Sequence, residues 1–120
     1  MIILDTNFII YAVKYKLAHD LEEYKNELAV PEQVIFELEM LSSKSEKVKD
    51  REDAKLGLLL VEKWNIKVLN ETGNADDAIE KLALKNQAKV ATMDKILVNK
   101  LKKGGVKILK IRQKNRLIFD

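Results

Sequence analysis

Short apolar segments alternate with segments of helical periodicity along the whole chain, and this alternation restricts the fold more than any other feature. Five segments rich in Ile, Val and Leu are expected to be strands: residues 1–4, 27–30, 66–69, 89–92 and 106–111. Because strands separated by helices pair in parallel through right-handed crossovers, the order predicts an α/β fold. We expect a three-layer α/β/α domain with a central parallel sheet, to which residues 117–119 add an edge strand.

The segments between these strands carry apolar residues at helical intervals. Helices are expected directly after residues 5–7, over residues 20–26, from Pro31 onward, and over residues 50–64, 74–86 and 94–103. Proline suits a first helical position, because the N–H that it lacks has no partner there. The polar residues 42–49 are expected to form an exposed turn.

Length and composition limit the class of protein. The chain has 120 residues and no cysteine, and 47% of its residues are hydrophobic. We therefore expect a single domain over residues 1–120, in which residues 112–120 form a basic tail or an edge strand, and no disulfide scaffold. No apolar run reaches the ~20 residues that a membrane span needs, and the start has no signal-peptide pattern. These features predict a cytoplasmic protein.

The charges are distributed unevenly along the chain. Residues 1–84 carry 11 Lys and Arg against 17 Asp and Glu, a net charge of −6, whereas residues 85–116 carry 11 Lys and Arg and one acid, a net charge of +10. A basic segment on an acidic body is typical of a protein that binds a polyanion. Charge alone equally fits lysines that only solvate the surface.

Four acids are placed where a parallel sheet binds its ligands. Asp5 follows the first expected strand, Glu37 lies six residues after Pro31, Asp76 opens the helix after the third strand, and Asp94 follows the fourth strand. Ligands of such sheets bind outside the carboxyl ends of the strands. Because gathered carboxylates repel one another, they need a cation, and a set of oxygen ligands selects Mg²⁺ or Mn²⁺.

Each of these acids also has an ordinary structural interpretation, as a helix cap or a solvated side chain. Four neighbouring acids are expected to lie on helix surfaces: Glu39, Asp50, Asp53 and Asp77.

Four segments together resemble the PIN-domain ribonucleases: residues 2–7, 30–37, 74–83 and 90–94. The resemblance covers residues 1–111. It looks closest to the archaeal relatives of the eukaryotic PIN nuclease that processes small-subunit ribosomal RNA. The VapC toxins share this fold and its acids.

The resemblance implies a role for each motif residue. Asp5, Glu37, Asp76 and Asp94 would be catalytic and bind the metal ions, and Thr6, Asn7 and Thr92 would support them with hydrogen bonds. Asp76 is preferred to Asp77 because Ile79 and Ala83 then follow at the family's spacing. Met93 departs from the pattern, because Asn or a small residue is common at that position.

The leading hypothesis is a metal-dependent endoribonuclease that hydrolyses single-stranded or looped RNA in ribosomal RNA processing or ribosome assembly. Seven residues are candidates for RNA contacts: Lys100, Lys102, Lys103, Lys110, Arg112, Lys114 and Arg116. The resemblance also implies a homodimer. The alternatives are a VapC-type toxin ribonuclease with an antitoxin partner, and an RNA-binding or ribosome-assembly module with little catalysis. A phosphoacceptor domain is disfavoured, because the third strand ends at Asn70 and not at an Asp.

Overall fold

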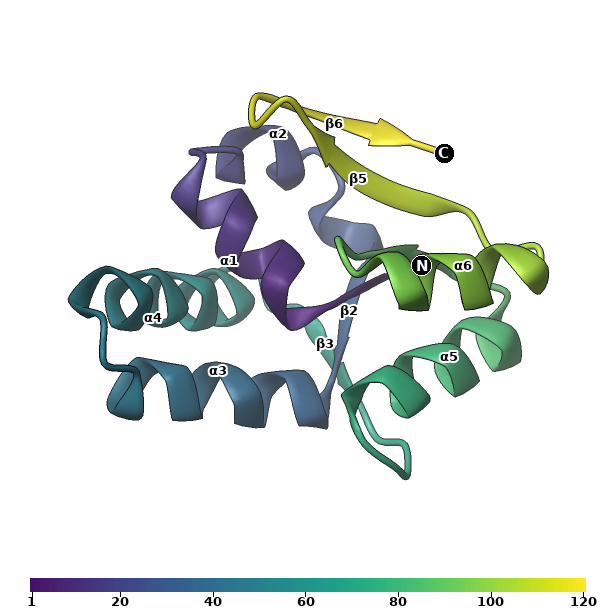
Figure 1. Ribbon diagram of the computed structural model, residues 1–120, viewed down its shortest axis with the longest axis horizontal. Coiled ribbons are helices and arrows are strands. Elements are labelled where there is room, and N and C mark those ends of the chain that lie inside the picture. The colour runs from purple at the N-terminus through teal and green to yellow at the C-terminus, as the bar shows by residue number, and fades with distance from the viewer.

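The computed structural model describes residues 1–120, and a six-stranded sheet runs through the middle of the molecule (Figure 1). The strand order is β3-β2-β1-β4-β5-β6. The strands are β1 (Ile2–Leu4), β2 (Leu28–Pro31), β3 (Lys67–Leu69), β4 (Lys89–Ala91), β5 (Ile108–Arg112) and β6 (Arg116–Phe119). All neighbours pair in parallel except β5 and β6, which form an antiparallel hairpin at the edge. The predicted α/β fold with a central, largely parallel sheet is confirmed.

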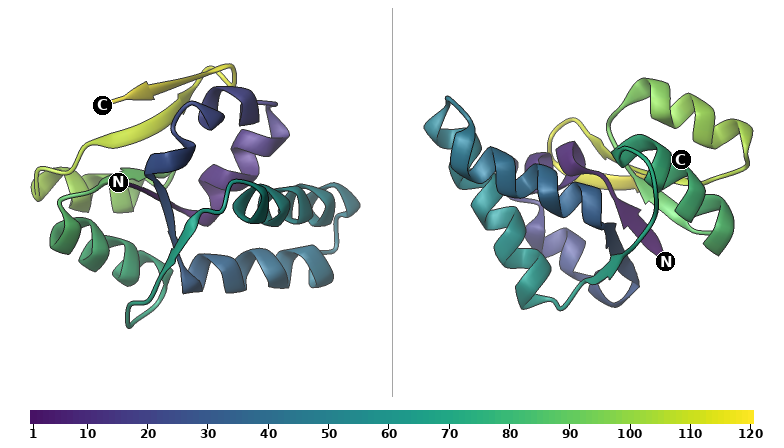
Figure 2. Two further views of the ribbon diagram at one scale, coloured as in Figure 1. Left: turned by 180° about the vertical axis from the view of Figure 1, so that it is seen from behind. Right: turned by 90° about the horizontal axis from the view of Figure 1, so that it is seen from below.

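Helices cover both faces of this sheet. They are α1 (Thr6–Lys14), α2 (Ala18–Glu22), α3 (Glu32–Lys44), α4 (Val48–Lys63), α5 (Ala75–Asn86) and α6 (Lys95–Lys103), with a 3-10 turn at Lys25–Glu27. Figure 2 shows α3 and α4 on one side of the sheet and α5 and α6 on the other. None of these helices is both long and apolar enough to cross a membrane.

The direction in which the chain winds reverses at β1. From β1 the chain moves outward to β2 and then β3, and it then crosses to β4 on the other side of β1. The three residues of β1 are at most 1% exposed, so the strand lies in the centre of the core. Because strand order reverses at β1, the crevice outside its carboxyl end is the expected ligand site.

The ends of α3 differ from the sequence prediction. Pro31 is the last residue of β2 and the N-cap of α3, with an extended backbone (φ −69°, ψ 151°), so the helix starts at Glu32. The expected turn over residues 42–49 is wrong for its first and last residues. Ser42 and Ser43 continue α3 and donate hydroxyl hydrogen bonds to the Glu39 carbonyl, and α4 already begins at Val48.

Two other predictions need correction. The helix expected over residues 20–26 is α2 followed by the short 3-10 turn. Asp53 was expected on the surface of its helix but is fully buried, with Lys49 Nζ 3.1 Å from its Oδ1. The buried face of α4 consists of Asp53, Ala54, Gly57 and Val61. A buried carboxylate is tolerated where a cation lies beside it.

Candidate functional site

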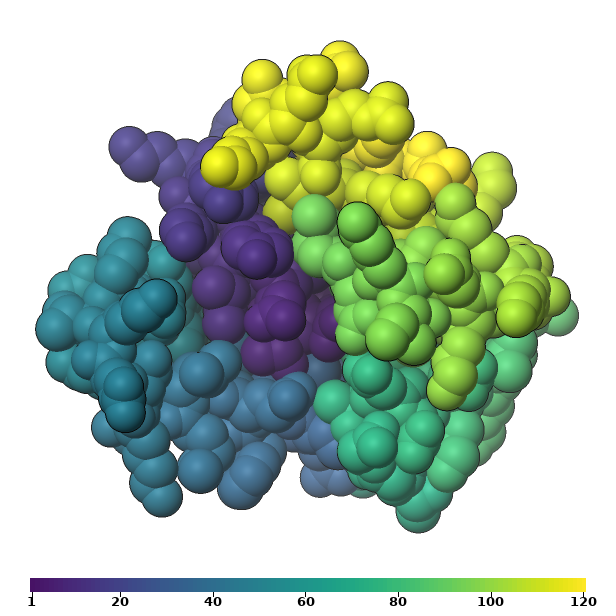
Figure 3. Space-filling model, viewed as in Figure 1, coloured from purple at the N-terminus to yellow at the C-terminus, as the bar shows by residue number.

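The four acids predicted from the sequence line one pocket at the carboxyl ends of the central strands. The pocket has a volume of about 440 Å³, and ten residues line it: Asp5, Thr6, Asn7, Phe36, Glu37, Met40, Leu41, Ala75, Asp76 and Asp94. The space-filling view in Figure 3 shows the chain start, in purple, where α3, α5 and α6 meet at the surface. The pocket therefore lies at the reversal of strand order, where the fold predicts a ligand site.

Asp5 is the most enclosed of the four acids. It caps α1, the residue is 7% exposed, and its backbone N–H donates to the Ala91 carbonyl at 3.0 Å. Its Oδ1 accepts a hydrogen bond from the Thr6 N–H at 2.8 Å, and its Oδ2 accepts one from Thr92 Oγ1 at 2.7 Å. Burial raises the pKa of Asp5 against the effect of these hydrogen bonds, and the charges of Asp76 and Glu37 add to the rise.

Glu37 is tied to the same corner from a different helix. The Thr6 hydroxyl donates to Glu37 Oε1 at 2.6 Å, so the start of α1 and the second turn of α3 are joined at the pocket. The structure thus brings Glu37 into the group, although it lies two turns along its helix.

Asp94 serves as a helix cap and also lines the pocket. Its Oδ1 accepts from the Ile96 and Leu97 N–H groups at 2.9 and 3.2 Å at the start of α6. Its own N–H donates to Thr92 Oγ1 at 3.1 Å, so the fully buried Thr92 joins Asp94 to Asp5. Both capping bonds use the same carboxylate oxygen, Oδ1.

Asp76 lines the pocket, whereas its neighbour Asp77 does not. Asn74 caps α5 by accepting the Asp77 N–H at 2.9 Å, which places Asp76 in the exposed first turn. Burial and the charges of Asp94 and Glu37 raise the pKa of Asp76. The choice of Asp76 over Asp77 agrees with this geometry.

The charge and chemistry of the pocket suit a hydrated, hard divalent cation. The titratable side chains that line it are all carboxylates, and the raised pKa values of Asp5 and Asp76 reflect burial and mutual repulsion. No three Asp, Glu or His side chains are close enough together to form a complete ligand set for one ion. Mg²⁺ does not need such a set, because it is usually bound by one or two carboxylates together with water and phosphate oxygens.

The seven predicted RNA-contact residues do not form a single cluster. Lys102 of α6 and Lys110 of β5 line one groove. Lys100 is close enough to Asp76 for its charge to oppose, in part, the rise in the pKa of that carboxyl. Lys103 is exposed at the end of α6.

The remaining three basic residues lie on the β5–β6 hairpin. Arg112 pairs with Arg116 in the strand register, and Lys114 Nζ lies 5.6 Å from the centre of the Tyr15 ring. Because β5 is parallel to β1 and β4, this end of the hairpin lies at the same edge of the sheet as the acidic pocket.

Gln33 is a residue of this region that the sequence analysis missed. Its Nε2 donates to the carbonyls of Glu71 at 2.6 Å and Gly73 at 2.9 Å, which ties α3 to the loop before α5. It lines a second hollow, next to the acidic pocket, together with Glu37 and Asn74. These contacts join residues 38 and 40 positions apart, so no local sequence signal identifies them.

Comparisons with known proteins agree with this architecture. A family model described as a PIN-like domain matches residues 2–114. The chain is 37% identical to ribonuclease VapC4 of Methanocaldococcus jannaschii, in an alignment that covers 94% of this chain and 91% of that protein.

Two solved structures share the fold. A domain of a functionally unknown protein from Methanocaldococcus jannaschii superposes with a TM-score of 0.62 at 19% identity, covering 98% of this chain and 94% of that one. VapBC2 from Rickettsia felis, bound to a DNA fragment from its promoter, superposes with a TM-score of 0.64 at 19% identity, covering 92% of this chain and 99% of that one.

The relative of 37% identity bears on the functional interpretations that the sequence left open. Its name supports a VapC-type ribonuclease better than the expected processing of ribosomal RNA. The family match spans nearly the whole chain and includes all four acids of the pocket. This chain belongs to the PIN-like domain family.

Proposed function

We propose that this protein is a VapC-type endoribonuclease that hydrolyses RNA phosphodiester bonds with Mg²⁺ or Mn²⁺ held at the acidic pocket. One observation carries the proposal: four carboxylates from four separate segments line one pocket at the reversal of strand order. The 37% identity to a protein named a ribonuclease supports the same chemistry.

The chain's own residues would hold the ion and keep its ligands oriented. Asp5, Glu37, Asp76 and Asp94 would supply the carboxylates, directly or through water. When bound, such an ion lowers the pKa of a water molecule and neutralises charge on the phosphate. The hydroxyls of Thr6 and Thr92 fix three of the acids by hydrogen bonds to Glu37 and Asp5 and from the Asp94 N–H.

The adjacent acids Asp76 and Asp77 provide a matched test. We expect Asp76→Asn to reduce Mn²⁺-dependent cleavage of a structured RNA by about 100-fold or more, on the scale of losing one preorganised electrostatic group. Asp77→Asn removes the same charge one residue away, outside the pocket, and is expected to stay within about threefold of the unchanged protein. Cleavage is followed on gels with and without EDTA.

Three results would count against a nuclease. They are uncleaved RNA, cleavage that persists in Asp5→Asn, and equal losses for Asp76→Asn and Asp77→Asn. Binding of RNA without metal-stimulated cleavage would favour the alternative of an RNA-binding module.

The VapC-type assignment includes an antitoxin partner. The solved VapBC2 structure from Rickettsia felis has this fold in a complex. For this chain we propose inhibition by a cognate VapB-type protein, tested by adding the purified partner to the cleavage assay. Undiminished cleavage at saturating partner would remove this part of the proposal.

A further inference from the structure

A groove with a basic lining leads away from the acidic pocket. It lies between α6 and β5, has a volume of about 400 Å³, and starts at Thr92, the residue that contacts both Asp5 and Asp94. Lys95, Asn99 and Lys102 line it from α6. Their spacing of four and three residues places them on one face of the helix, so the groove follows the helix axis.

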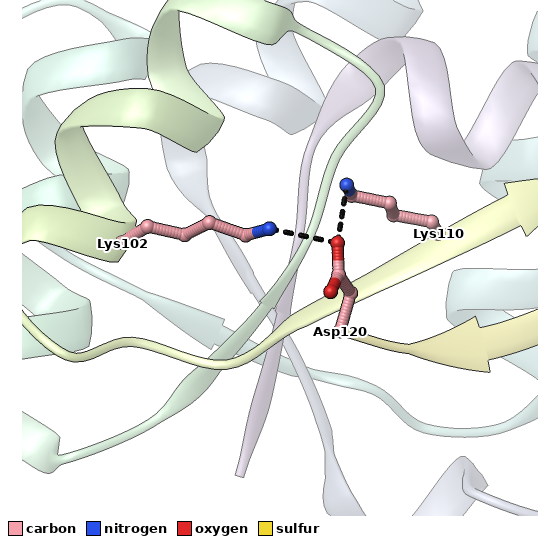
Figure 4. A network of polar contacts seen from close by, with 3 residues as sticks. All are labelled: Lys102, Lys110 and Asp120. Atoms are coloured by element: carbon pink, nitrogen blue, oxygen red, sulfur yellow. Dashed lines mark hydrogen bonds and ion pairs between the residues drawn. The ribbon is translucent and has the colours of Figure 1, made fainter.

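A carboxylate joins two of the lysines that line this groove. Asp120 Oδ2 accepts hydrogen bonds from Lys102 Nζ at 2.7 Å and from Lys110 Nζ at 2.6 Å, as Figure 4 shows. The backbone of Asp120 continues the β5–β6 ladder through reciprocal hydrogen bonds with Ile108 at 2.7 and 3.0 Å. The side chain therefore reaches the two lysines from a fixed strand position.

Two ammonium groups converge on a single oxygen atom at this point. The hydrogen bonds and charges of Lys102 and Lys110 lower the pKa of Asp120 to about 2, so the carboxylate is ionised at neutral pH. Without an anion between them the two lysines would repel each other. The position is therefore selective for a negatively charged oxygen.

The stability of the fold does not account for this arrangement. The side chains of Lys102, Lys110 and Asp120 are 41%, 32% and 47% exposed. Ion pairs this exposed contribute little to the stability of a fold. Lysine is a common point-charge ligand of phosphate, so a phosphate oxygen can replace the carboxylate with the same two partners.

We propose that this groove binds the phosphates of an RNA strand that extends from the acidic pocket, and that Asp120 is an internal competitor for the phosphate position between Lys102 and Lys110. The choice of RNA rests on the proposed function. Thr92 and Met93 line the groove and Asp94 lines the acidic pocket, so a bound strand would pass over residues 92–94.

Binding of a labelled single-stranded RNA, measured by fluorescence anisotropy in EDTA, tests the proposal. Asp120→Asn removes the competing charge and keeps the backbone ladder, and we expect it to tighten binding by about three- to tenfold at low salt. Glu52→Gln is the matched control, because Glu52 is an exposed acid of α4. It is expected to change binding by less than about twofold.

The gain must depend on the two lysines. In the Lys102→Ala/Lys110→Ala background, Asp120→Asn is expected to have no effect. That double variant alone is expected to weaken binding. It should also reduce the slope of log affinity against log salt concentration by the amount expected for about two phosphate contacts. Equal effects of Asp120→Asn and Glu52→Gln, or a gain that persists without the lysines, would overturn the proposal.

Two further measurements distinguish the remaining outcomes. If Asp120→Asn does not fold, the lysine double variant provides the test. RNA affinity and salt dependence that are both unchanged in this variant would contradict phosphate binding in the groove. An oligo-glutamate probe that gains as much as RNA from Asp120→Asn would instead assign an acidic peptide. Cleavage by the unchanged protein, measured separately with Mn²⁺, shows whether the nuclease function fails independently of this site.

Discussion

Asp5 carries a carboxylate whose ionised form is disfavoured in the metal-free fold. Its carboxylate is nearly enclosed and lies near Asp76 and Glu37, so burial and like charges raise its pKa above that of the unfolded chain. The folded state then binds the Asp5 proton more tightly than the unfolded state. This contribution to stability is complete at low pH and is lost as the pH rises through the folded-state pKa.

Replacement of Asp5 by Asn should therefore stabilise the metal-free protein at neutral pH. The amide can still accept the Thr6 N–H and can donate to the Thr92 hydroxyl, so both contacts survive without the charge. We expect the melting temperature of Asp5→Asn in EDTA at pH 7 to rise by about 2–5 °C. The difference should shrink as the pH is lowered and the carboxyl of the unchanged protein gains its proton.

Thermal melts at pH 7 and below check the prediction, with Asp77→Asn as the control for a general change in charge. A lower melting temperature for Asp5→Asn at pH 7, or a difference independent of pH, would show that burial and like charges do not raise the pKa of this carboxyl.

Prediction from sequence worked for the positions of residues that directly follow a strand. Asp5 and Asp94 directly follow strands, and the sheet geometry alone brings them to one edge. Asp120 and Gln33 could not be found in this way. Their partners lie 10 to 40 residues away, and only the packing of α6, β5 and the loop before α5 makes these contacts.

At the scale of elements, polar composition misled the assignment of α3. Ser42 and Ser43 favour turns in general, yet both donate to carbonyls three or four residues earlier and so fit inside a helix. In α4, only the assignment of Asp53 to the helix surface was wrong. Asp53 and Gly57 face inward, and Leu56 and Leu59 remain 47% and 57% exposed. Close packing of α4 against α1 and α3 decides this face, because a Cβ at Gly57 would lie 2.7 Å from Ile9 Cγ2.

Gln33 couples two elements of the site, because it holds the loop from which Asp76 is presented. We expect Gln33→Ala to reduce RNA cleavage by about fivefold to tenfold while costing about 1 kcal/mol of stability, the scale of lost hydrogen bonds. Gln33→Glu should be worse, because a carboxylate would face the two carbonyl oxygens of Glu71 and Gly73. Gln113→Ala, at an exposed position in the β5–β6 turn, is the control.

Steady-state cleavage assays and amide exchange over α5 check this coupling. Faster exchange at the start of α5 should accompany the loss of activity in Gln33→Ala. Unchanged exchange and activity would show that the loop holds Asp76 in place without this side chain.

At the scale of the whole molecule, the charge asymmetry has a spatial meaning. The acidic pocket lies outside β1, and basic residues line the neighbouring groove and the β5–β6 hairpin beyond it. The proposed cation site and the proposed RNA-binding surface are thus side by side, as the proposed nuclease function requires. The homodimer implied by the family resemblance stays a prediction, and light scattering of the purified protein would test it.

Four distant segments are proposed to build one site for a divalent cation. Anomalous diffraction at the manganese edge, from crystals soaked in Mn²⁺, would locate the bound ion. We expect a peak in the pocket among Asp5, Asp76 and Asp94, absent from crystals of Asp5→Asn soaked identically. An empty pocket at saturating Mn²⁺, or manganese bound only elsewhere on the protein, would contradict it.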